Sequence, residues 1–277
     1  MTLEDRIAKW AASQSAIEAL VLMGSRVRAS DDTVWRPDPQ SDWDFQIFTS
    51  QPEAFEQPDW LRGLGVEVKA YAVRRTAIGS VPKIAVLFEG GEADLVIVPV
   101  GPWRRARWLT FLGLHRYSAR LRAQLRDLAV VIRPGWKFLK GVETWEPFYR
   151  RVVAEIDDPR LSDAAVRNLA ESFVCDMVWT LRKIERGESL AAQRMLHRSL
   201  VETNIRLLHE LKLRRQERSF PEARRAERVL AAHELELIAT SAVPAAESLR
   251  AAVDKCAASC RELAGQLVGE SWRWPAL

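Results

Sequence analysis

The hydrophobic periodicity of the chain changes once, close to Pro99 and Pro102. Before these prolines, apolar residues alternate with polar ones in several segments, such as Trp43–Thr49, and a period of two is typical of a half-buried strand. After them, apolar residues recur every three or four positions, which is the period of an amphipathic helix. The two patterns in succession predict an α+β protein, with a sheet in the first part and a helical bundle in the second.

One helix and about five strands are predicted in the first hundred residues. Thr2–Ser13 has apolar residues at helical spacing, and Thr2 is a suitable N-cap. Strand-like apolar segments follow at residues 17–23, 43–49, 66–73, 83–88 and 93–98. The last two flank Glu89–Glu92, whose central Gly-Gly predicts a hairpin turn. We therefore expect a mixed sheet with helices in an N-terminal domain.

The rest of the chain is predicted to form an antiparallel bundle of about four or five helices. Apolar stripes or helix-forming composition identify the segments 166–184, 189–215, 221–240 and 245–267. Pro221 stands at a first-turn position, where proline is tolerated. We expect a domain of residues 1–135 and a helical domain of residues 136–277.

Several protein classes are excluded by composition. The longest apolar runs break within about six residues, well short of the ~20 that span a bilayer. The N-terminal residues include early acids and no apolar core of a signal peptide. Three cysteines are too few for a disulfide framework, and Cys256 and Cys260 lie on an apolar helical stripe, which favours core packing over zinc binding. We therefore expect a cytoplasmic protein without a membrane segment.

Three aspartates stand on segments that we expect to be neighbouring strands. Asp42 and Asp44 flank Trp43, and strand alternation puts both carboxylates on one face, about 7 Å apart along the chain. Asp94 interrupts the otherwise apolar second arm of the hairpin. A charge in such a strand is costly unless it is paired or holds a metal. Clustered carboxylates are ligands that suit Mg²⁺, so these residues are candidate metal ligands.

A second candidate motif, Gly24-Ser25-Arg26, follows the first apolar strand. Glycine lets a phosphate approach the backbone, the serine hydroxyl and the amides can donate to phosphate oxygens, and an arginine adds a bidentate cation. The order of the elements is typical of a metal-dependent nucleotidyl-transfer site. A strand is followed by Gly-Ser, then by Asp-x-Asp, and then by a third Asp within a strand.

The order of these motifs resembles the polymerase-β-like nucleotidyltransferase superfamily. The segment Phe88–Pro99 is most similar to the aminoglycoside 6-adenylyltransferases, or streptomycin adenylyltransferases, in which Asp-aromatic-Asp is followed by a Phe-Glu-x-Gly-x-x-Asp-Leu-x-x-x-Pro hairpin. The similarity covers residues 17–100. Farther along, Arg194–Leu196 and Glu202–Asn204 resemble part of one helix in that family's C-terminal domain.

The resemblance implies roles for individual residues. It implies that Asp42, Asp44 and Asp94 bind Mg²⁺, with Asp94 also a candidate base. It implies that Gly24, Ser25 and Arg26 hold the phosphates of ATP, and that AMP passes to a hydroxyl of a small molecule such as streptomycin, which is antibiotic-resistance chemistry. Glu202 and Asn204 have two interpretations. Either they form a polar helix face, or they contact the acceptor substrate.

The charge distribution bears on the acceptor. Residues 1–100 carry 10 Lys/Arg and 15 Asp/Glu, whereas residues 101–277 carry 31 and 22. A basic second part suits an anionic partner better than a polycationic drug. Two basic stretches, at 104–126 and 212–228, have three possible interpretations. They form a solvated basic face, hold the triphosphate or contact RNA. Two alternatives therefore stand beside the first: a nucleotidyltransferase acting on RNA or protein, as in toxin–antitoxin pairs, and an inactive nucleotide-binding interaction protein.

Overall fold

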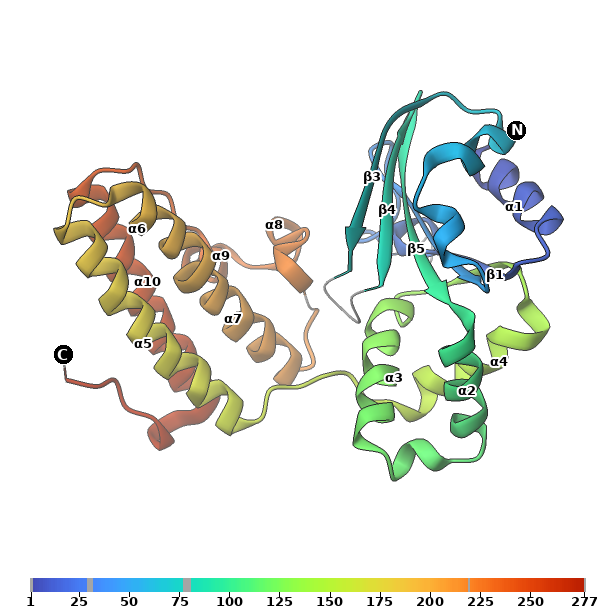
Figure 1. The fold of residues 1–277 in the computed structure, drawn as a ribbon. Coiled ribbons are helices and arrows are strands. Elements are labelled where there is room, and N and C mark those ends of the chain that lie inside the picture. Colours follow the sequence, from blue (N-terminus) through green and yellow to red (C-terminus); the bar gives the residue numbers. More distant parts are fainter. Residues whose placement is uncertain (1, 29–31, 77–80, 219, 277) are drawn as a thin grey trace. The chain divides into compact units, whose positions relative to one another are not determined.

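The protein consists of two compact units in a computed structural model that describes residues 2–28, 32–76, 81–218 and 220–276. The first unit spans Met1–Pro159 and the second Arg160–Leu277 (Figure 1). The first contains a sheet covered by helices, and the second is helical. The predicted α+β class, with a mixed sheet followed by a helical bundle, is confirmed. Among the described residues, no helix is both long enough and apolar enough to cross a membrane.

A six-stranded mixed sheet forms the centre of the first unit. Its strands are β1 (Ile17–Met23), β2 (Trp43–Thr49), β3 (Val68–Arg75), β4 (Pro82–Phe88), β5 (Gly91–Pro99) and β6 (Lys137–Lys140). They lie in the order β3-β4-β5-β2-β1-β6. β2 and β5 are parallel, and the other neighbouring strands are antiparallel. The predicted hairpin is the β4–β5 pair.

Helices cover both faces of this sheet (Figure 1). α1 (Leu3–Ser13) packs on one face with two short 3₁₀ segments. α2 (Val100–Phe111), α3 (Ala119–Ile132) and α4 (Val142–Glu155) follow the sheet and pack on the other face. There the ring of Phe48 stacks on that of Trp145, with 4.5 Å between centroids. Thr2 caps α1 as predicted, since its hydroxyl accepts from the Asp5 amide at 3.2 Å.

The first compact unit extends past the predicted domain boundary after residue 135. β6 pairs with β1, and α4 buries Trp145 and Tyr149 against the sheet. Both elements therefore belong to the first unit, which ends at Pro159. A period of three or four residues indicates a helix, but it does not indicate which core that helix joins.

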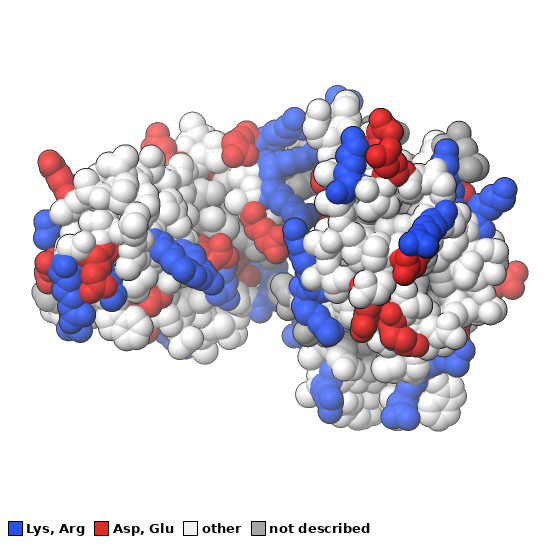
Figure 2. Space-filling view, turned by 45° about the horizontal axis from the view of Figure 1, so that its top comes forward, with Lys and Arg blue, Asp and Glu red and all other residues white. Residues whose placement is uncertain are grey.

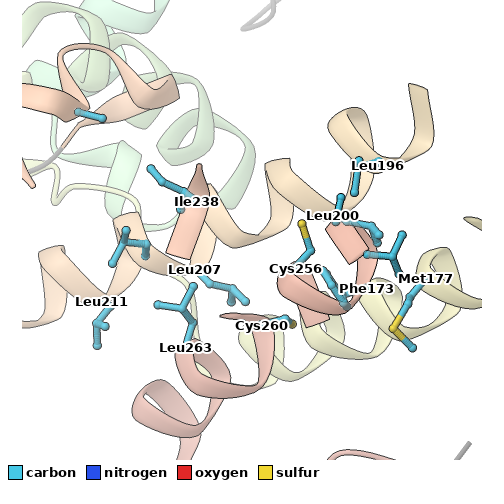
Figure 3. Packing of buried hydrophobic residues seen from close by; sticks show 14 of the residues in the cluster. Phe173, Met177, Leu196, Leu200, Leu207, Leu211, Ile238, Cys256, Cys260 and Leu263 are labelled. Carbon is cyan, nitrogen blue, oxygen red and sulfur yellow. The ribbon is translucent and has the colours of Figure 1, made fainter. Parts of the chain in front are cut away.

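The second unit contains α5 (Asp163–Glu185), α6 (Ser189–Met195), α7 (Glu202–Arg214), α8 (Ala226–Val229), α9 (Ala232–Ile238) and α10 (Ala246–Val268). Its core is built from apolar side chains of these helices, among them Phe173, Leu207 and Leu263 (Figure 3). Cys256 and Cys260 lie in this core, as predicted. Burial raises the pKa of the Cys260 thiol to about 12.

Two of the predicted helices differ from the structure. The segment 189–215 contains a π-helical turn, Leu196–Val201, between α6 and α7. The segment 221–240 is not one helix, because Glu222, Ala223 and Arg225 have φ values of 54°, 59° and 54°. Left-handed residues of this kind interrupt helical hydrogen bonding. None of the three is glycine, so the sequence carries no signal for the break.

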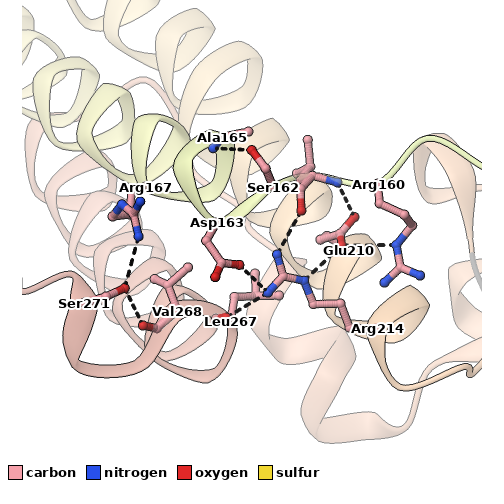
Figure 4. Close-up of polar contacts among 11 residues, drawn as sticks. Arg160, Ser162, Asp163, Ala165, Arg167, Glu210, Arg214, Leu267, Val268 and Ser271 are labelled. Carbon is pink, nitrogen blue, oxygen red and sulfur yellow. Dashed lines mark hydrogen bonds and ion pairs between the residues drawn. The ribbon is translucent and has the colours of Figure 1, made fainter.

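A buried ion-pair network ties the ends of α5, α7 and α10 together (Figure 4). The Glu210 carboxylate, whose side chain is 3% exposed, accepts from Arg160 Nε at 3.2 Å and from Arg214 Nε at 3.0 Å. It also accepts from the Leu161 amide at 3.0 Å. Arg214 in turn donates to the carbonyl of Leu267 at 2.9 Å. The buried Glu210 carboxylate therefore pairs with both arginines, and Asp163 gives Arg214 a second acidic partner at 2.9 Å.

We expect Glu210→Gln to lower the free energy of unfolding of the helical unit by about 1–3 kcal/mol, because the neutral amide weakens the charge-assisted hydrogen bonds that the buried carboxylate accepts. Urea denaturation followed by far-UV circular dichroism measures this. Glu236→Gln changes an exposed glutamate in the same unit and should leave the transition in place. Equal stability of the two variants would contradict the structural role of the network.

Candidate active site

The turn after β1 brings a glycine against an aspartate. Met23, the last residue of β1, pairs with Asp44 of β2, and Gly24 follows with a φ of +74°. A Cβ atom on Gly24 would lie 2.0 Å from Asp44 Oδ2. A residue with a side chain would meet both backbone strain and a steric clash here. Glycine therefore permits the close approach of this turn to the Asp44 carboxylate.

The three candidate aspartates converge at one end of the sheet. Asp44 and Asp94 are direct partners in the parallel β2–β5 pair. Asp42 lies two residues before Asp44 and so on the same face of the strand. A carboxylate oxygen from each of the three lies within 4.8 Å of the others, and all three residues are partly exposed. The sequence placed the right carboxylates together; their role as metal ligands stays a prediction.

The donor set fits a divalent cation. Three anionic oxygen ligands so close together repel one another unless a cation lies between or beside them, and Mg²⁺ prefers such hard oxygen ligands. The partly exposed position also leaves room for the water and substrate oxygens that Mg²⁺ usually keeps. The residues present therefore suit the metal that the motif order implies.

Lys83 is a charged residue of this site that the sequence analysis missed. Its Nζ lies 2.5 Å from Asp94 Oδ2, with side-chain exposures of 32% for Lys83 and 24% for Asp94. In the antiparallel β4–β5 pair, Asp94 stands opposite Ala85, so Lys83 is its diagonal neighbour on the same face. The register of the β4–β5 hairpin is the signal that identifies Lys83, because it places this residue diagonally opposite Asp94.

Ser25 and Arg26 have different surroundings. The hydroxyl oxygen of Ser25 is buried and has no hydrogen-bond partner among the described residues. Arg26 donates from Nε to the carbonyl of Asp42 at 2.9 Å and from Nη2 to the carbonyl of Ser41. Its guanidinium carbon stands 3.9 Å from the ring centroid of Trp43. Arg26 thus anchors the backbone that leads to Asp42, while the Ser25 hydroxyl keeps an unused donor in the turn after β1.

A cavity of about 540 Å³ adjoins this region. Arg26 and Trp43 line it, together with the hairpin turn at Glu89–Gly91. Trp43 alternates with the two aspartates along β2, so the cavity lies on the other side of the strand from the carboxylates. Its volume is in the range of small-ligand sites.

The two candidate residues in the helical unit have separate environments. Asn204 is fully buried, and its Nδ2 donates to the carbonyl of Cys256 at 3.0 Å. It therefore links α7 to α10 within the core. Glu202 is exposed at the start of α7. Their predicted role in acceptor binding stays a prediction, and the burial of Asn204 favours a packing role for that residue.

No family model and no curated protein matches the chain. Among solved structures, an aminoglycoside 6-adenyltransferase from Bacillus subtilis is similar over 99% of this chain and 92% of its own, with 16% identity and a TM-score of 0.40. A nucleotidyltransferase-like protein from Exiguobacterium sibiricum 255-15 is similar over 97% of this chain and 76% of its own, with 11% identity and a TM-score of 0.37. Identities and TM-scores this low leave the activity of this chain to be inferred from its own site.

Proposed function

We propose that the first unit is a metal-dependent nucleotidyltransferase that moves AMP from ATP to a hydroxyl group. The observation that carries this proposal is the convergence of Asp42, Asp44 and Asp94, whose oxygens lie within 4.8 Å of one another, beside the Gly24–Ser25 turn. The order and spacing of these motifs along the chain give independent support, because they resemble those of nucleotidyltransferases.

In the proposed mechanism, Asp42, Asp44 and Asp94 hold Mg²⁺. The bound metal would neutralise triphosphate charge and favour loss of the acceptor proton. The unpartnered Ser25 hydroxyl donates to a phosphate oxygen, and the backbone at Gly24 allows the phosphate to come close. The acceptor oxygen forms a bond to the α-phosphorus, the bond from that phosphorus to pyrophosphate breaks, and the hydroxyl proton passes to Asp94.

Arg26 has a positioning role in this proposal as well as the phosphate contact that the motif implies. Its hydrogen bonds to the carbonyls of Ser41 and Asp42 fix the residues that lead into β2. Lys83 holds a positive charge against Asp94 and so reduces repulsion among the three carboxylates when no cation is bound.

The acceptor that we propose first is an aminoglycoside-type hydroxyl, on the basis of the Phe88–Pro99 motif. A specific observation favours a second candidate, an RNA or protein acceptor: residues 101–277 carry 31 Lys/Arg against 22 Asp/Glu, and a polycationic drug favours acidic surroundings. We place the protein in the cytoplasm, since its three cysteines are free thiols.

The test is incubation of the protein with ATP labelled at the α-phosphate, Mg²⁺ and a panel of streptomycin, other aminoglycosides and tRNA. We expect label to move to one acceptor class with release of pyrophosphate, and a chelator to abolish both. Absence of transfer and of pyrophosphate release with every acceptor, while ATP still binds, would favour the inactive interaction protein instead.

A further inference from the structure

A surface of the first unit concentrates positive charge away from the aspartate site. Residues 100–126, which form α2, the 3₁₀ turn Leu114–Arg116 and the first half of α3, contain seven arginines and neither aspartate, glutamate nor lysine. We call this the α2–α3 surface. In Figure 2, basic and uncharged side chains lie together at the lower end of this unit. Such a charge density attracts a polyanion.

A cavity of about 300 Å³ opens in the α2–α3 surface. Arg116, Arg122 and Arg126 line it. Arg122 and Arg126 are exposed and stand one turn apart on α3, where like charges at this spacing destabilise a helix. Within the described part of the chain, neither has an acidic partner within 4.0 Å, although Arg122 donates to the carbonyl of Arg116. The cavity is thus lined by two arginines, Arg122 and Arg126, that form no ion pair within the described residues.

The acidic lining of the cavity offsets only part of this charge. Glu155 is already shared by three basic groups: Arg151 at 2.7 Å, His115 Nε2 at 3.1 Å and Arg116 at 3.2 Å. The other acid, Asp157, is exposed. The His115 side chain is 3% exposed, and its Nδ1 has no hydrogen-bond partner among the described residues. The exposed guanidinium groups of Arg122 and Arg126 are donors of the kind that bind an anion of phosphate size.

Exposed aromatic rings stand on the same segment as the arginines of the cavity. Trp108 is 62% exposed, Phe111 45% and Tyr117 86%. Trp108 and Phe111 are three residues apart on α2 and so share a face, and Tyr117 directly follows the cavity residue Arg116. The guanidinium carbon of Arg151, which pairs with Glu155, stands 5.4 Å from the Phe111 ring centroid. Phe111 and Tyr117 are therefore neighbours of groups at the cavity, and Trp108 is a neighbour of Phe111 on α2.

We propose that the α2–α3 surface binds single-stranded RNA, with Arg116, Arg122 and Arg126 holding backbone phosphate and with Trp108 and Tyr117 stacking on bases. Interleaved cations and exposed rings are what unstacked, single-stranded nucleic acid requires. A membrane-binding helix instead separates an apolar face from a basic one, whereas here exposed rings and arginines alternate along one segment of the sequence. The inference goes beyond nucleotidyl transfer, because binding at this surface needs neither ATP nor metal.

Fluorescence anisotropy with a labelled single-stranded RNA oligonucleotide, in chelator and without nucleotide, tests the proposal. We expect the double variant Arg122→Gln/Arg126→Gln to weaken binding at least about tenfold and to reduce the salt slope by roughly 1.4, which is about 0.7 for each lost phosphate contact. Trp108→Ala should weaken binding by about fivefold or more through lost stacking. The matched control, Arg198→Gln/Arg250→Gln, removes the same charge from exposed positions of the helical unit and should keep most of the affinity.

Equal loss in the two double variants would overturn the proposal, because it would show a diffuse charge effect. Unchanged RNA affinity of the Arg122→Gln/Arg126→Gln variant would also overturn it. So would binding to vesicles of phosphatidylserine and phosphatidylcholine in place of RNA, which would identify a membrane surface. Thermal unfolding of each variant checks that the first unit stays folded. Because no ATP or metal is present, failure here leaves the nucleotidyltransferase proposal untouched.

Discussion

Asp44→Asn is expected to reduce AMP transfer by roughly 10³-fold, the scale of losing a principal electrostatic contact to the reacting phosphates. Asp44 occupies the middle of the candidate site: it pairs with Asp94 across the β2–β5 ladder, and Gly24 lies directly against its carboxylate. Removing its charge takes away one of three anionic ligands, so we expect Mg²⁺ to bind more weakly and in a shifted position. Transfer of label from ATP measures the first effect, and calorimetric titration with Mn²⁺ measures the loss of metal affinity.

The matched control for this variant is Glu92→Gln. Glu92 stands two residues before Asp94 in β5 but is exposed and lies outside the cluster of three aspartates. It loses the same unit of charge, and we expect transfer within about twofold of the unmodified protein because isolated exposed charges contribute little. If Asp44→Asn retained full transfer and full Mn²⁺ affinity, the metal-site assignment would be wrong.

Much of the site was predictable because strands impose a simple rule on side chains. Alternation alone placed Asp42 and Asp44 on one face of Trp43–Thr49, and the boundaries of β1 and β2 follow directly from their apolar runs. The Gly-Gly turn fixed the hairpin that carries Asp94. Strand alternation and turn type depend on residues that are adjacent in the sequence. They can therefore be predicted without knowing which distant segments pack together.

The remaining features depend on partners far away in the chain. The contact of Lys83 with Asp94 follows from the hairpin register, and the meeting of Asp44 with Asp94 follows from a parallel pairing that no local signal specifies. Arg26 was read as a phosphate ligand from its position after Gly-Ser, yet two of its donors are used by carbonyls of residues 41 and 42. The role of Arg26 therefore depends on hydrogen bonds to residues 15 and 16 positions away. A short sequence motif does not specify such bonds.

The glycine of the turn offers the second large effect. We expect Gly24→Ala to lower AMP transfer by roughly 10²-fold or more, because its Cβ would stand 2.0 Å from Asp44 Oδ2 and the carboxylate must move out of the metal-binding arrangement. A misplacement of about 1 Å in a catalytic group is enough for a loss of this size. The variant also forces alanine into a backbone conformation with φ of +74°, at a cost of about 1–2 kcal/mol.

Gly113→Ala separates these two causes. Gly113 has nearly the same φ, +75°, but a Cβ there would meet no atom within 4 Å. Both variants therefore share the backbone strain, and urea denaturation should show a loss of stability in each, with the larger loss for Gly24→Ala because its added carbon also clashes with Asp44. Only Gly24→Ala should lose AMP transfer and Mn²⁺ affinity, since only there does the added carbon displace an aspartate. Equal activity of the two variants would mean that the approach of Gly24 to Asp44 has no part in forming the site.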